Sequence, residues 1–169
     1  MTAAQLSHAV RSLVVVTVGA ALAAVVFASG AHAGPETPPF NLEVILRDVS
    51  GGKGFGHVKF RQRNDGSKVV FLDTWVRDLA PNHSYRLQRA VDQSLDGDCT
   101  STAWLTLGRG LEPREIATDD RGTGRADLFR SFAALATGTQ FDIHFQVIDA
   151  VTLAPVLQSG CYRFTVRGR

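Results

Sequence analysis

The chain has 169 residues, with 18 Lys or Arg against 16 Asp or Glu and a formal net charge of +2 at pH 7. A charge this close to zero argues against a partner held by bulk electrostatic attraction, and we expect no nucleic-acid partner. The length leaves room for one folded domain after an N-terminal export segment.

Residues 1–33 have the pattern of a signal peptide. Arg11 ends a short positive start, a run of small and apolar residues follows from Leu13 to Ala28, and Ala31-His32-Ala33 has the small-x-small form of a cleavage site. We therefore expect a secreted or periplasmic protein that begins near Gly34 and has no membrane span after processing. The alternative is an uncleaved anchor, because the uncharged stretch is long enough to cross a bilayer.

Residues 34–40 predict an extended spacer, because proline cannot donate to a strand ladder and biases its neighbours away from helix. Residues 41–169 then form a single domain. Within it the apolar residues recur with a period of two, which indicates half-buried strands. The predicted strands are Gly56–Arg63, Lys68–Asp78, Tyr85–Val91, Ala103–Leu107, Glu115–Thr118, Gly124–Phe132, Gln140–Asp149 and Val156–Arg167.

The helical signal is confined to Leu128–Ala136, so parallel crossovers have no helices to carry them. Short strands separated by turn signals predict an antiparallel sandwich or barrel, and we expect an all-β antiparallel Greek-key β-sandwich of about seven to nine strands. Strand Lys68–Asp78 is apolar on both faces. The face that carries Phe71 and Trp75 is either buried or open as a contact surface.

The segment Leu79–Tyr85 has the spacing Leu-x-Pro-x-x-x-Tyr, with Pro81 as its proline. This spacing resembles the tyrosine corner of immunoglobulin-like and fibronectin type III sandwiches, in which the phenol packs under the corner and bonds a backbone group upstream. The resemblance implies that Leu79, Pro81 and Tyr85 are structural rather than ligand-binding residues.

A series of segments, in this order along the chain, is similar to segments of copper-zinc superoxide dismutases. They are the strand Gly56–Gln62, the corner Asp78–Pro81, the cysteine segment Cys99–Ser101, the turn and strand Thr118–Leu128 and the last strand Ser159–Val166. The resemblance implies the same sandwich architecture and a disulfide between Cys99 and Cys161. Two lone cysteines in a small exported domain are also expected to be bridged.

The resemblance does not extend to the metal ligands. The positions of the family's copper-binding His-x-His pair fall within Arg86–Arg89, and no histidine lies between Cys99 and His144 in the sequence. The family's guiding arginine corresponds to Gln158. A shared fold without these ligands implies no dismutase chemistry, and we expect neither a metal nor another cofactor.

The other candidate site residues are scattered. His57, His83 and His144 remain after processing, far apart in sequence, and the Asp-rich turns 96–98 and 119–120 lack the spacing of a calcium loop. A composite metal or catalytic site around His144 is one alternative. A Cys161 nucleophile with His144 as its base is another, although a bridged cysteine has no thiolate.

Lys59, Arg61 and Arg63 share one strand face, and Arg163 and Arg167 share another. Cross-strand pairing with Asp73, Asp127 or Asp142 is the structural interpretation, and contact with an anionic partner is the functional one. We expect an exported, non-enzymatic binding or interaction module whose partner is unknown and is either another protein or an anionic surface. The alternatives are a secreted metal-binding protein or enzyme around His144, and a structural, envelope-associated protein.

Overall fold

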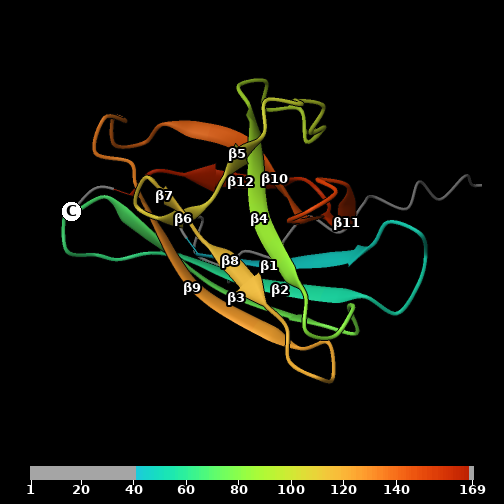
Figure 1. The fold of residues 1–169 in the computed structure, drawn as a ribbon. Helices are drawn as coiled ribbons and strands as arrows, with labels where there is room; N and C mark the ends of the chain where they lie inside the picture. The colour runs from blue at the N-terminus through green and yellow to red at the C-terminus, as the bar shows by residue number, and fades with distance from the viewer. Residues whose placement is uncertain (1–40, 168–169) are drawn as a thin grey trace, which may run out of the picture. The chain divides into compact units, whose positions relative to one another are not determined.

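The structure, a computed structural model, describes residues 41–167. The signal peptide and the spacer predicted for residues 1–40 lie outside the described residues. The described part of the chain is all-β, with twelve strands and no helix (Figure 1). The strands are β1 (Asn41–Asp48), β2 (Phe55–Gln62), β3 (Val69–Arg77), β4 (Ser84–Asp92), β5 (Leu105–Thr106), β6 (Gly108–Arg109), β7 (Glu112–Pro113), β8 (Glu115–Ala117), β9 (Gly124–Ser131), β10 (Gln140–Asp149), β11 (Pro155–Ser159) and β12 (Tyr162–Thr165).

The hairpin of β2 and β3 shows how the sequence pattern becomes structure. In β2 the even-numbered residues are buried and the odd-numbered residues are more exposed, so the alternation of apolar and polar residues produces an inner and an outer face. In the connecting turn the Asp65 carboxylate accepts a hydrogen bond of 2.9 Å from the N–H of Ser67. Gly66 has a φ of 75°, a conformation that favours glycine.

One hydrogen-bonded path runs in the order β5-β4-β10-β11-β1-β2-β3-β9-β6-β7, while β12 pairs with β10 and β8 with β4. Strands β1, β2, β3 and β9 are therefore neighbours, and β4 and β10 belong to the other half of the sheet (Figure 1). The segment after β4 bridges the two halves. The N–H of Leu107 donates to the carbonyl of Leu87 in β4, and the N–H of Gly110 donates to the carbonyl of Phe129 in β9. The result is a nearly closed, barrel-like sheet.

Three phenylalanines occupy the centre of the core. Phe60 of β2, Phe145 of β10 and Phe164 of β12 are each at most 2% exposed. The ring centroid of Phe60 lies 5.9 Å from that of Phe145 and 4.8 Å from that of Phe164, both edge to face, which is a favoured aromatic geometry. Burying one such ring stabilises the fold by about 1.5–3 kcal/mol. These contacts join the first strands of the domain to the last.

The twelve strands differ from the seven to nine expected from the sequence in three ways. β1 is absent from the predicted strands, β6 and β7 have only two residues each, and the predicted strand Val156–Arg167 divides into β11 and β12. The pairing is mixed, because β6 runs parallel to β9. Leu128–Ala136 is not a helix: β9 extends to Ser131 and pairs along its whole length with β3, and this ladder outweighs local helical propensity.

Candidate functional site

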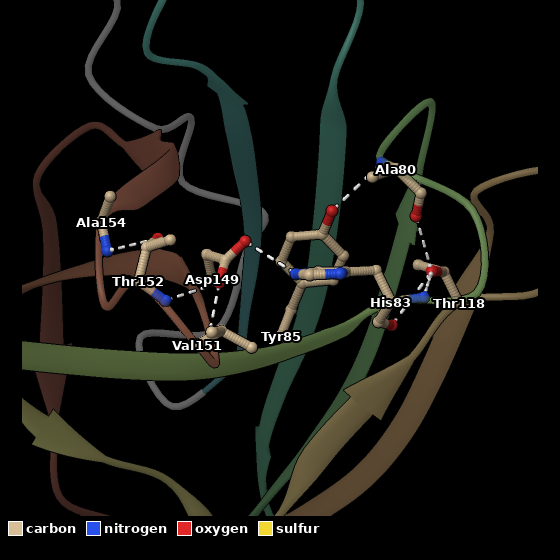
Figure 2. A network of polar contacts seen from close by, with 8 residues as sticks. All are labelled: Ala80, His83, Tyr85, Thr118, Asp149, Val151, Thr152 and Ala154. Carbon is tan, nitrogen blue, oxygen red and sulfur yellow. Dashed lines mark hydrogen bonds and ion pairs between the residues drawn. The ribbon is translucent and has the colours of Figure 1, made fainter.

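The segment Leu79–Tyr85 makes the corner between β3 and the start of β4, and Figure 2 shows its Ala80, His83 and Tyr85. The Tyr85 ring is buried, and its hydroxyl accepts a hydrogen bond of 3.0 Å from the backbone N–H of Ala80. Leu79 packs against the core, whereas Pro81 is exposed. Burial raises the pKa of Tyr85, so the phenol stays neutral. The Tyr85 hydroxyl thus has a backbone partner within the turn.

Thr118, which follows β8, holds the other side of the corner. Its Oγ1 accepts a hydrogen bond of 3.0 Å from the N–H of His83. The same oxygen lies 2.7 Å from the carbonyl oxygen of Ala80 and 3.0 Å from that of His83, and either carbonyl can accept its proton (Figure 2). One hydroxyl therefore satisfies backbone groups at two points of the turn.

His83 also contacts a carboxylate. Its Nε2 lies 2.7 Å from Oδ2 of Asp149, while Oδ1 of Asp149 accepts hydrogen bonds from the N–H groups of Thr152 and Val151 (Figure 2). These backbone bonds, with His83 as a further cause, lower the pKa of Asp149 to about 2. A histidine-carboxylate pair recurs in catalytic sites, but the hydroxyl groups drawn near it in Figure 2, those of Tyr85, Thr118 and Thr152, all bond backbone groups. The pair ties the turn after β10 to the corner.

Cys99 and Cys161 form a disulfide, as the resemblance implied, with 62 residues of sequence separation. The loop that carries Cys99 is also held by side chains. The N–H of Gly97 donates to Asp142, whose carboxylate is buried and bound to Arg163 at 2.9 Å. The hydrogen bond from Arg163 is the main cause that lowers the pKa of Asp142. The expected pairing of surface cations with carboxylates thus occurs here between Arg163 and Asp142.

His144, the centre of the alternative metal or catalytic site, lies under this loop. Its Nε2 is 3.0 Å from the carbonyl oxygen of Ser101, which can only accept, so Nε2 carries the proton. The indole of Trp104 lies over the imidazole with centroids 4.6 Å apart. Among the described residues no group of three or more His, Cys, Asp or Glu side chains could hold a metal ion. Cys161 is held in the disulfide and offers no thiolate to a neighbouring base.

The segment at which the resemblance placed copper ligands holds ordinary polar pairs. Arg86 contacts Glu115 at 2.9 Å on the outside of β4. The amide of Gln88 accepts from Gln146 at 2.7 Å and donates to Thr106 at 3.0 Å. These side chains join β4 to β10, β5 and β8, which is a structural use of the positions.

The predicted cationic residues lie on the outward side of β1, β2, β3 and β9, here called the outer face. Lys59 and Arg61 project from β2, and Arg63 follows the end of that strand. Lys59, Arg61 and Arg125 of β9 help to line a hollow of about 330 Å³. The other residues that line it are His57, Asp73, Thr74 and Trp75. The structure thus brings Lys59 and Arg61 together with a cation that the sequence analysis did not single out.

Aromatic rings lie between the cations of the outer face. The guanidinium of Arg63 lies 4.2 Å from the ring centroid of Phe71, and that of Arg77 lies 5.0 Å from Phe55 and 5.8 Å from Trp75. Each distance is within the range of a cation–π contact. Phe71 and Trp75 are half-buried, so this side of β3 lies between the two expectations, neither fully buried nor fully open.

Carboxylates offset part of this positive charge. Glu43 of β1 contacts His57 and lies 4.0 Å from Arg61. Lys59 stands opposite Glu43 on one side and opposite Asp73 on the other. The outer face is therefore a mixed surface in which the cations exceed the anions.

Another cavity, of about 560 Å³, lies at one end of the sheet between β4 and β9 and includes two arginines, Arg89 and Arg130. Arg89 ends the segment at which the resemblance placed copper ligands, and neither arginine was predicted as a site residue. The signal that could have found them is their position: each falls where the period of two calls for an inward-facing apolar residue.

The sequence matches no protein-family model and no curated protein. Across residues 41–167 there is also no helix with the length and apolarity needed to cross a membrane. The proposals on function that follow therefore depend on the contacts of the outer face and on the residues that line the cavity.

Proposed function

We propose that the chain is an exported, non-enzymatic binding module that holds an anionic polysaccharide on its outer face. The observation that carries this proposal is the alternation of guanidinium groups with half-buried aromatic rings around Phe55, Phe71 and Trp75. A guanidinium that lies over a ring is fixed in place but keeps its N–H donors for a second partner.

The chemistry of these groups favours carboxylate or sulfate oxygens. Arginine binds such groups through two parallel hydrogen bonds, and a desolvated pair of this kind is stronger than a neutral hydrogen bond. Aromatic rings at a surface supply apolar contact area for the uncharged parts of a partner. Because the net charge of the whole chain is small, the attraction would be local to the outer face and sensitive to salt.

The finer assignments of fold and location belong to the same proposal. The grouping of β1, β2, β3 and β9 apart from β4 and β10, together with the disulfide, supports a Greek-key β-sandwich similar to the copper-zinc superoxide dismutases. A disulfide that closes a long loop fits an oxidising compartment and thus export through residues 1–33.

The test is retention on immobilised heparin, a sulfated polysaccharide, in a salt gradient. The variant Lys59→Gln/Arg61→Gln/Arg63→Gln is expected to elute at lower salt than the parent. The matched control, Lys53→Gln/Arg114→Gln/Arg121→Gln, removes the same charge from exposed positions elsewhere. It is expected to elute with the parent. Equal shifts for the two variants would show bulk charge rather than a site, and retention of neither parent nor control would refute the proposal.

A further inference from the structure

Two arginines face the inside of the sheet. In β4, Arg89 belongs to the same alternating row as the buried Tyr85 and Leu87, and in β9, Arg130 belongs to the row of the buried Leu128. β4 and β9 are the strands that the short β5 to β7 segment bridges. Inward-facing positions of a closed sheet are normally apolar, because charge is costly to remove from water.

Both arginines line the cavity of about 560 Å³ at the end of this bridge. Its volume lies within the range of small-molecule sites. Apolar side chains form most of its wall: Val91, Phe132, Leu135, Phe141 and Ile143. The remaining lining residues are Gln93, Ser131, Ala134, Thr139 and Gln140. No carboxylate is among the described residues that line it.

The positive charge in the cavity is left without an anion. Within residues 41–167 neither Arg89 nor Arg130 forms an ion pair; Arg130 donates to the carbonyl of Gly110 at 3.0 Å. Burial and the neighbouring Arg130 lower the pKa of the Arg89 guanidinium, which nevertheless keeps its proton at neutral pH. Two like charges beside apolar walls destabilise each other, and an anion placed between them would offset both costs.

We propose that this cavity binds a monocarboxylate with a hydrocarbon body, with the carboxylate between Arg89 and Arg130 and the hydrocarbon against Phe132 and Phe141. The arginine pair matches a carboxylate in charge and in hydrogen-bond geometry. The apolar wall excludes small hydrophilic anions as preferred ligands, since they would leave it in contact with water. The site is separate from the outer face, because Arg89 and Arg130 belong to the inward rows of their strands.

The experiment is isothermal titration of the purified protein with decanoate, with acetate and 1-decanol as probes of the two halves of the ligand. We expect one saturable decanoate site per chain and binding at least tenfold weaker for acetate and for 1-decanol. Arg89→Met keeps the length of the side chain and removes its charge, and it is expected to weaken decanoate binding at least tenfold. Arg121→Met makes the same change at an exposed position that belongs to neither the cavity nor the outer face, and it is expected to leave decanoate binding unchanged.

Arg89 is the better position for the main variant, because Arg130 also bonds Gly110 and its loss would disturb the bridge between strands. A second variant, Leu135→Glu, places a carboxylate at the cavity wall and should compete with decanoate even if Arg89→Met folds poorly. Absence of a saturable site, equal affinity for 1-decanol, or full affinity in both cavity variants would overturn the proposal. None of these results depends on whether the outer face binds heparin.

Discussion

The corner around Tyr85 and the outer face are both rich in polar side chains, yet these side chains have different partners. At the corner, the hydroxyls of Tyr85 and Thr118 and the carboxylate of Asp149 all bond backbone groups. On the outer face, the cations lie over aromatic rings or near exposed carboxylates. A backbone partner is fixed by the fold, whereas a side chain at the surface exchanges readily with solvent or ligand. The kind of partner therefore separates the corner from the outer face, the proposed binding surface, better than the number of polar groups does.

The largest effect on stability is expected on the structural side, from Cys99→Ser/Cys161→Ser. A loop with a sequence separation of 62 residues contributes about 4 kcal/mol on the chain-entropy model. Urea denaturation should show this loss in the free energy of unfolding. Titration of the unreduced, unfolded parent should find no free thiol, and two reactive thiols per chain would contradict the disulfide.

Tyr85→Ala is expected to lower the free energy of unfolding by about 3 kcal/mol or more, because it removes a buried ring and leaves a cavity. Tyr85→Phe keeps the ring and removes one hydrogen bond to Ala80, so its expected cost is only about 1 kcal/mol. Chemical denaturation of the two variants measures the difference. A Tyr85→Ala protein as stable as the parent would show that the corner does not stabilise the fold.

Asp149 should make the free energy of unfolding depend on pH in the acidic range. Its pKa in the folded protein, about 2, lies below the ordinary value for aspartate, so the folded state binds fewer protons than the unfolded state. The stabilisation is therefore complete above about pH 4 and is lost as the pH falls through about 2. Unfolding of the parent and Asp149→Asn should differ at pH 6 and converge near pH 2. A constant difference across this range would contradict the assignment.

The smallest effect is expected from Lys59→Gln/Arg61→Gln/Arg63→Gln, which should change the free energy of unfolding by about 0.5 kcal/mol or less. Exposed cations contribute little to stability, and the cation–π contact of Arg63 is at the surface. Chemical denaturation under the conditions used for the Tyr85 variants measures this change in the free energy of unfolding. A loss of 2 kcal/mol or more would show that the outer face belongs with the corner as a structural region.

The strands could be predicted from sequence where one face is buried, as in β2, because the period of two is visible over eight residues. The same pattern could not reveal β6 and β7, because a strand of two residues is too short to show a period of two. Asp149 and His83 lie 66 positions apart, and only the pairing of β4 with β10 brings them together. Their contact therefore required the register of the sheet.

The outer face and the cavity also differ in how far the sequence could predict them. Lys59 and Arg61 were predictable because a strand whose polar residues all face one way has a solvent side. Arg89 and Arg130 were not, because they interrupt the apolar rows of two strands that are distant in sequence and meet only across the β5 to β7 bridge. One such interruption in a single strand indicates little, whereas the two interruptions at this end of the sheet line one cavity.

The order of the strands also bears on how this chain behaves among copies of itself. Unpaired backbone at the edge of a sheet is a template for intermolecular β-pairing and aggregation. The hydrogen-bonded path through the described residues ends in β5 and β7, which have two residues each, and the off-path strands β8 and β12 have three and four. The long strands, from β1 to β4 and from β9 to β10, each have neighbours on both sides, although β6 pairs with β9 only at Phe129 and β11 pairs with β1 only from Leu46 to Asp48. Among the described strands, the edge left for a neighbouring molecule to extend therefore lies mainly in the parts of β1 and β9 that lie beyond their short pairings with β11 and β6.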